Sequence, residues 1–171
     1  MVKLVGMLLV LFSASSLGYL FSLKYKMRRW MLKSLISSLN LFKIEVTYSK
    51  SPLNEILTAI SQSADKTIKF IFSKTAEMLS QNEGYTAGEA WEIALNEWNS
   101  DYLKKEDKEI LKSFGYGLGN SDVYNQEKNF DLAIELLKRQ LSNAEEESKK
   151  NEKLYKNIGV LTGLAIIILF L

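Results

Sequence analysis

The chain has 171 residues, 47% of them hydrophobic and 25% charged, with a formal net charge of +2. It contains no cysteine and no histidine, which removes disulfides, thiol chemistry and the commonest general base and metal ligand. A nearly balanced charge argues against a nucleic-acid binder, which would carry a stronger basic excess. We therefore expect no cofactor, no metal and no nucleic-acid partner.

The charge is concentrated in the middle of the chain, and the runs 4–23 and 157–171 contain no charged residue. As a helix the first run spans roughly 30 Å, the thickness of a bilayer hydrocarbon core. The apolar part of the second run, residues 158–171, spans only about 21 Å, so a span also needs Leu154, Tyr155 and a Lys156 that reaches the headgroups. We predict transmembrane helices at 1–23 and 157–171, with a helical domain at 24–156 between them.

A cleaved signal peptide is the alternative interpretation of the first run. Lys3 would then be the basic start, and the small residues of 13–15 the cleavage site. The apolar run continues past that site to Leu23, and basic residues follow it, which favours a retained anchor. Under the alternative, the protein would be an exported, tail-anchored helical binding module.

Basic residues flank both apolar runs on their inner sides. They are Lys24, Lys26, Arg28 and Arg29 after the first run, and Lys149, Lys150, Lys153 and Lys156 before the second. Because positive residues are retained on the cytoplasmic side of a membrane, both flanks predict a cytoplasmic central domain with the termini outside.

Small residues four positions apart occur in both runs. Ala14 and Gly18 form one pair, and Gly159 and Gly163 form the other. Such spacing lets helix backbones approach closely in lipid. The pairs can join the two segments to each other or to a second copy of the chain.

The middle of the chain shows apolar residues at steps of three and four, the period of an amphipathic helix. The predicted helices cover 27–46, a stretch opened by Ser51 and Pro52, 64–80, a stretch opened by Thr86, 107–114, and a last helix from 121 or 122. Thr86 and Glu89 have the capping-box spacing. With no alternating segment typical of a strand, we predict an all-α, antiparallel bundle with a membrane span at each end.

Two further expectations concern the packing of these helices. Trp91 and Trp98 lie on the apolar face of their helix and are expected in the core rather than on a binding surface. The highly charged stretch 145–156 nearly lacks apolar residues, so we expect a solvated arm that leads into the membrane.

No catalytic constellation can be assembled from the polar residues. The spacing Gly115-x-Gly117-x-Gly119 lacks the strand and the Gly-Lys-Ser/Thr of nucleotide loops and favours a helix end. Glu106, Asp107 and Glu109 are mixed with lysines, as at an ordinary helix N-terminus. We expect no enzyme; a membrane-bound enzyme that uses these three acids is the remaining catalytic alternative.

Several motifs together resemble one known family over nearly the whole length. They are the opening apolar segment, Glu45-x-x-Tyr48-x-x-x-Pro52-Leu53, Ala90-Trp91, Glu106-Asp107, Ile110-Leu111, Leu118-Gly119-x-Ser121-Asp122-x-x-x-Gln126, Lys153-Leu154-Tyr155-Lys156 and Gly159-Val160-Leu161-x-Gly163-Leu164. With these motifs the chain resembles the stage III sporulation protein AB family of endospore-forming bacteria. The run from Leu118 to Gln126 and the closing segment are the specific part.

The resemblance implies a kinship with the F-domain platform subunits of type II secretion and type IV pilus machines. It implies a non-enzymatic membrane scaffold in the channel between mother cell and forespore, with a secretion-type ATPase of the mother-cell cytoplasm and other proteins of the complex as partners. On this reading the partner contacts are expected at Glu106, Asp107, Gly115, Gly119, Asp122 and Gln126.

Overall fold

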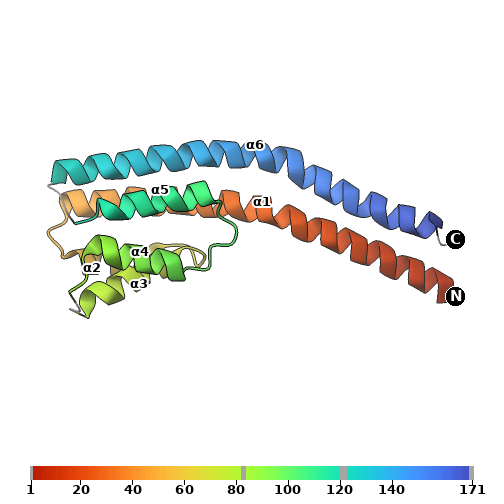
Figure 1. Ribbon diagram of the computed structural model, residues 1–171, viewed down its shortest axis with the longest axis horizontal. Helices are drawn as coiled ribbons and strands as arrows, with labels where there is room; N and C mark the ends of the chain where they lie inside the picture. The colour runs from red at the N-terminus through yellow and green to blue at the C-terminus, as the bar shows by residue number, and fades with distance from the viewer. Residues whose placement is uncertain (1, 82–83, 120–122, 170–171) are drawn as a thin grey trace. The chain divides into compact units, whose positions relative to one another are not determined.

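The computed structural model describes residues 2–81, 84–119 and 123–169 (Figure 1). It contains six helices: α1 (Val2–Tyr48), α2 (Leu53–Ser63), α3 (Lys69–Ser80), α4 (Ala87–Glu97), α5 (Lys105–Tyr116) and α6 (Val123–Leu169). No strand occurs in these described residues. The predicted all-α fold class is therefore confirmed for these residues.

The chain divides into two compact units. We call residues 1–29 with 142–171 the hairpin unit, and residues 30–141 the bundle unit. The helices α2 to α5 belong wholly to the bundle unit, whereas α1 and α6 each contribute a segment to both.

The first helix continues without a break from the apolar run into the amphipathic stretch, as predicted, and ends at Tyr48. Pro52 follows four residues later, and the residue before a proline is disfavoured in the helical conformation. Ser51 does not cap the next helix: Pro52 occupies the N-cap position with no side-chain cap hydrogen bond. The Ser51 amide donates instead to the Ser49 hydroxyl at 3.0 Å, so α2 begins one residue later than expected.

The third helix is shorter than the predicted 64–80. The Asp65 carboxylate accepts hydrogen bonds from the Thr67 amide at 2.9 Å and from the Thr67 hydroxyl at 2.7 Å. Such an aspartate turn competes with helical hydrogen bonding. As a result α3 starts only at Lys69, while Ile68 is still buried.

The predicted capping box is present at the start of α4. The Glu89 amide donates to the Thr86 hydroxyl at 3.3 Å, and the Thr86 amide donates to the Glu89 carboxylate at 2.8 Å. Two backbone donors that have no partner inside the helix are thereby satisfied.

An aromatic cluster forms the centre of the bundle unit. Its five rings come from five different helices: Phe42 on α1, Phe72 on α3, Trp91 on α4, Phe114 on α5 and Phe130 on α6. Neighbouring centroids lie 4.9–6.3 Å apart in edge-to-face arrangements, the geometry that aromatic pairs prefer. These rings therefore tie the helices of the bundle together.

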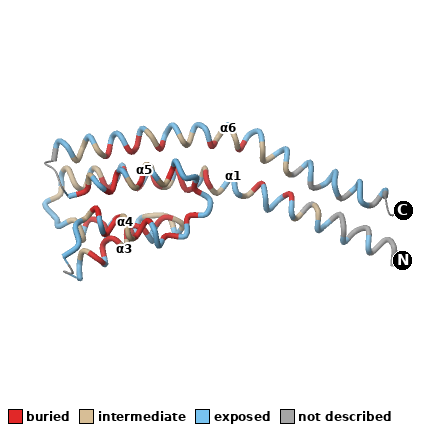
Figure 2. The backbone as a smooth tube through the Cα atoms, in the orientation of Figure 1, coloured by how far each residue is buried: buried red, intermediate tan, exposed pale blue. Residues whose placement is uncertain are grey.

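Aliphatic side chains extend this core along the helices. On α1 the buried positions recur at steps of three and four through Leu32, Leu35 and Leu39 (Figure 2). Trp91 and Trp98 are both buried, which confirms their predicted place in the core. At the edge, the Lys43 ammonium on α1 pairs with Glu127 and Asp131 on α6 at 3.1 and 2.8 Å.

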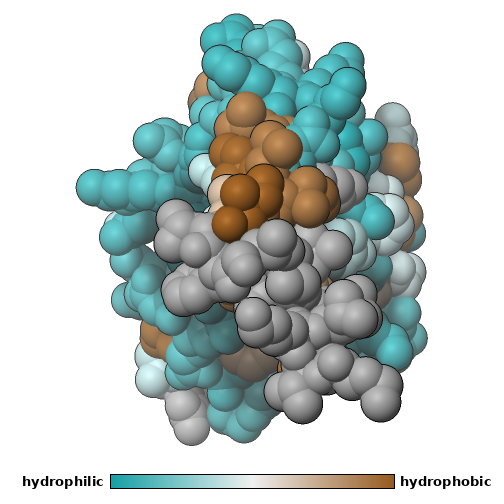
Figure 3. All heavy atoms as spheres, turned by 90° about the vertical axis from the view of Figure 1, so that its right-hand side faces the viewer, coloured by the Kyte–Doolittle hydropathy of each residue, from teal (hydrophilic) through white to brown (hydrophobic). Residues whose placement is uncertain are grey.

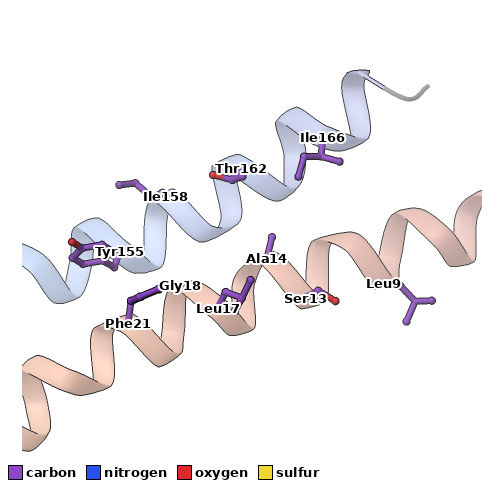
Figure 4. Close-up of a pocket in the computed structure, with 10 residues that line it drawn as sticks. All are labelled: Leu9, Ser13, Ala14, Leu17, Gly18, Phe21, Tyr155, Ile158, Thr162 and Ile166. Carbon is purple, nitrogen blue, oxygen red and sulfur yellow. The ribbon is translucent and has the colours of Figure 1, made fainter. Parts of the chain in front are cut away.

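In the hairpin unit, α1 and α6 run antiparallel and side by side (Figure 4). Arg28 is buried and pairs with Glu147 at 3.1 Å, and Arg29 pairs with Glu152 at 3.7 Å. Phe21 stacks on Tyr155 with centroids 6.0 Å apart. The charged stretch 145–156 is therefore not a free arm: its acids meet the basic cluster of α1, and Ser148 within it is buried.

Among the residues that the structure describes, no helix contains a stretch that is both long enough and apolar enough to cross a membrane.

Candidate functional site

The residues expected to contact a partner lie mainly around α5 and the turn that follows it. Asp107 is fully buried, and its carboxylate accepts a hydrogen bond from the Lys104 amide at 2.9 Å. Its position in the first turn of α5 stabilises the helix start. Glu106, beside it, is exposed. Only Glu106 of this pair presents a carboxylate at the surface.

Gly115 lies inside α5, not in a loop, and is buried. A Cβ atom built on it would lie 2.3 Å from Cδ1 of Trp91. The Trp91 indole donates to the Leu111 carbonyl at 2.8 Å, which holds the ring against this part of α5. A Cβ at Gly88 on α4 would likewise lie 2.9 Å from the Gly115 carbonyl oxygen. Gly115 therefore permits the close packing of α4 on α5 and offers no surface to a partner.

Two features lie where α5 ends and the chain turns: a side-chain hydrogen bond from α6 and a glycine in the left-handed conformation. The Asn129 side chain on α6 donates to the Phe114 carbonyl at 2.9 Å, which satisfies one of the free carbonyls of the last turn. Gly119 is exposed and has a φ of +76°, a conformation that glycine adopts without strain. Asp122 lies outside the described residues. Gln126 follows on α6 and is half-buried.

Two exposed tyrosines flank this turn, and the sequence analysis overlooked them. Tyr116 and Tyr124 are 57% and 64% exposed. Each has a lysine ammonium near its ring, Lys112 at 5.9 Å and Lys128 at 4.2 Å from the centroid. The signal in the sequence was the four-residue spacing of lysine and tyrosine, which places both on one helix face.

The charges beside these tyrosines are partly paired. Lys112 pairs with Glu92 at 2.8 Å. This hydrogen bond raises the pKa of Lys112 and lowers the pKa of Glu92. We call Tyr116, Gly119, Tyr124 and Gln126, together with Lys112 and Lys128, the turn surface; Glu106 lies at the other end of α5. It combines aromatic rings with cations, a composition that suits protein recognition.

The described part of the chain contains no group of three or more metal-ligating residues. Glu106 and Glu109 are exposed, whereas Asp107 is buried and engaged by the Lys104 amide. The three acids therefore do not converge on one point.

A groove runs between α1 and α6 in the hairpin unit, with a volume of about 560 Å³. Its lining is almost entirely apolar (Figure 4) and consists of Leu9, Ser13, Ala14, Leu17, Gly18 and Phe21 from α1, and Tyr155, Ile158, Thr162 and Ile166 from α6. Two predicted packing residues, Ala14 and Gly18, thus lie at the groove. Gly159 and Gly163 belong to α6, but their surroundings lie outside the described residues.

Large apolar side chains remain exposed along the hairpin unit. Phe12 is 74% exposed on α1, and Leu161 and Ile168 are 63% and 77% exposed on α6. Figure 3 views the end where the termini lie and shows hydrophobic atoms gathered on it. Exposed apolar side chains gathered at one end of a protein mark a site of contact with protein or lipid.

These features define a class: an all-α protein with an aromatic-centred bundle and an apolar helical hairpin made from its two ends. The family model described as stage III sporulation protein AB matches residues 3–171, and the chain belongs to that family. This membership supports a role in sporulation, and the family is not named for an enzyme activity.

Individual relatives agree with the family match. A protein of Bacillus subtilis (strain 168) described as stage III sporulation protein AB is 30% identical over 172 residues, which cover 100% of both chains. A solved structure described as stage III sporulation protein AB (SpoIIIAB) superposes with a TM-score of 0.66 at 28% identity. It covers 71% of this chain and 96% of that one.

Proposed function

We propose that the chain is a non-enzymatic membrane scaffold of a secretion-like channel complex that acts between mother cell and forespore during endospore formation. Its hairpin unit anchors it in the cell membrane through two spans. Its bundle unit lies in the mother-cell cytoplasm, where it docks a secretion-type ATPase and other proteins of the complex. Self-association in the membrane is part of the proposal.

The observation that carries the proposal is the apolar surface of the hairpin unit. Exposing Phe12, Leu161 and Ile168 to water is unfavourable by about 25 cal/mol per Å² of apolar area. Lipid removes this cost. The two charge-free runs of the sequence coincide with that surface, and the basic residues on their inner flanks favour a cytoplasmic bundle.

Cysteine labelling tests the orientation cleanly because the chain contains no cysteine of its own. Ser37, exposed in the bundle unit, is replaced by cysteine, and intact cells are treated with a membrane-impermeant maleimide. We expect labelling only after lysis. Labelling in intact cells, or a mature chain that has lost its first fifteen or so residues, would instead establish the exported binding module.

ATPase docking is tested with the full-length chain in membranes. The Glu106→Lys variant changes the exposed acid at the start of α5, and Tyr124→Ala changes an exposed member of the turn surface. Glu55→Lys is a matched exposed control on α2. We expect the first two to weaken ATPase binding by roughly fivefold or more if they are central contacts. Equal binding by all variants would reject the turn surface, and no binding by the wild-type chain would reject the coupling itself.

A further inference from the structure

The groove of the hairpin unit differs from the rest of the apolar surface because it contains space between the two helices for a ligand. Its volume of about 560 Å³ lies in the range of small-molecule sites. Small residues, Ala14 and Gly18, lie beside bulkier ones, Leu17 and Phe21, on the α1 wall. Because Leu17, Phe21 and Ile158 are also largely exposed, the groove is open along its side.

The dimensions of the groove match one lipid chain. Its α1 wall extends from Leu9 to Phe21, which corresponds to about 18 Å of helix. One leaflet provides half of the hydrocarbon thickness, about 15 Å. A single acyl chain in that leaflet would therefore run along the groove for nearly its full length.

The charge at one end of the groove points to the headgroup. Phe21 and Tyr155 close that end by stacking on each other. Lys24 is exposed and follows Phe21 by three positions, so it lies on the same face of α1 as the groove; Lys153 is also exposed but lies on the face of α6 opposite the groove. The nearby acids Glu147 and Glu152 are already paired with Arg28 and Arg29, so this end carries an excess of positive charge.

We propose that the groove binds an anionic phospholipid, with one acyl chain between α1 and α6 and the headgroup phosphate at Lys24. The site rests on the membrane anchoring proposed above. A helix from a second copy is less suitable as the occupant. Two copies that paired at this groove would share one orientation and bring their Lys24 ammonium groups together at one level, where like charges repel.

The test measures lipid retained by the full-length chain. The protein is purified in detergent, incubated with phosphatidylglycerol or phosphatidylcholine of matched acyl chains, and examined by native mass spectrometry. We expect the wild type to retain phosphatidylglycerol in preference. The Lys24→Gln variant should reduce that preference by about fivefold. Lys153→Gln, on the opposite face of α6, and Lys66→Gln and Lys138→Gln, exposed in the bundle unit, should leave it unchanged.

The acyl chain is tested by filling the groove. Ala14→Phe adds a ring from the α1 wall and Thr162→Phe adds one from the α6 wall, so the test survives if one variant does not fold. Both should lose most of the retained lipid of either kind. Ala165→Phe, an exposed position of α6 outside the lining, is the matched control and should retain it.

Each contrary result has a distinct meaning. If the filled variants retain as much lipid as Ala165→Phe, the groove is not the lipid site. If the wild type retains no lipid but forms a cross-linked dimer that Ala14→Phe abolishes, a second copy occupies the groove and the lipid proposal is wrong. If the chain is removed from membranes by alkaline carbonate, the membrane anchoring itself fails, and this readout does not depend on the groove.

Discussion

The contact between Gly115 and Trp91 is the tightest constraint on a single residue in the bundle unit. The indole ring of Trp91 occupies the space that a side chain at position 115 would fill, and its N–H donates to the Leu111 carbonyl. Trp91 has no exposed surface, and it is one of the five rings of the aromatic cluster. A side chain at position 115 would therefore disturb the centre of the core.

Replacement of Gly115 by alanine should destabilise the bundle. The new Cβ would lie far inside van der Waals contact with the ring, and overpacking of a core costs about 1–3 kcal/mol. Urea unfolding followed by tryptophan fluorescence measures the loss, since all three tryptophans lie in the bundle unit. Ser113→Ala, exposed on the same helix, should stay within about 0.5 kcal/mol of wild type; equal stability of both variants would refute the packing role.

The capping box of α4 should make stability depend on pH. The Thr86 amide and hydroxyl hold the pKa of Glu89 below its ordinary value of 4.5. A depressed carboxyl pKa contributes stability above that value, and the contribution disappears as the pH falls through the depressed pKa.

The Glu89→Gln variant should therefore be less stable than wild type at neutral pH and approach it at acidic pH. Urea midpoints measured across the pH range test this, with the exposed Glu109→Gln as the comparison. A constant difference between wild type and Glu89→Gln at all pH values would contradict the assignment.

Local sequence rules predicted some residue roles and missed others. The capping box could be predicted because both partners lie within one turn of the chain. Asp107 and Gly115 were predicted to contact a partner, yet both side-chain positions are buried. Their burial depends on which helix packs against α5, and this information is not present in the spacing of nearby residues.

At the scale of elements, α1 and α6 pair through charged groups where they join the hairpin unit. Arg28 is nearly inaccessible, and Glu147 provides its charge partner from the other helix. Removal of the acid would take this charged hydrogen bond away from a buried cation, and losing one partner of a buried group costs about 1–3 kcal/mol.

Glu147→Ala should accordingly loosen the pairing of α1 with α6 near Arg28. Hydrogen exchange of the amides around residue 28 measures this local opening, which should become roughly five- to hundredfold more frequent for that free-energy cost. The exchanged pair Arg28→Glu with Glu147→Arg should restore protection. Glu146→Ala, exposed on the same turn, should behave as wild type; unchanged exchange in Glu147→Ala would show that the ion pair does not hold the helices.

Periodicity predicted the existence of every helix but not all of their ends. The start of α3 was placed too early because a hydrogen bond between Asp65 and Thr67 replaces the first turn. The stretch 145–156 was expected to be solvated because it lacks apolar residues. Much of it is exposed, but two of its acids pair with α1 and Ser148 is buried. A complementary charge pattern more than a hundred residues away is not visible in a local window.

At the scale of the whole molecule, the hydrophobic core lies almost entirely in one unit. The large buried side chains, from Met31 to Leu137, belong to the bundle unit. All five rings of the aromatic cluster are included. The bundle unit therefore contains the interactions needed for its own folding.

A fragment of residues 30–141 should fold without the hairpin unit. We expect a water-soluble helical protein with cooperative urea unfolding and a near-ultraviolet dichroism signal from the packed rings. Size-exclusion chromatography and dichroism measure these properties. Aggregation, or a transition that differs between the two probes, would show that the bundle depends on the hairpin segments.

The aromatic cluster can be completed only late in the synthesis of the chain. The ion pair beside it joins Lys43 to Asp131, 88 residues apart in the chain, and Phe130 on α6 is the last ring to be made. At about 5–20 residues per second the ribosome needs about 4–18 s to cover that interval. For most of that interval the apolar start of the chain has left the exit tunnel of the ribosome, while the core still lacks its closing helix. A chaperone or insertion machinery that holds the N-terminal run during those seconds would protect the chain from aggregation.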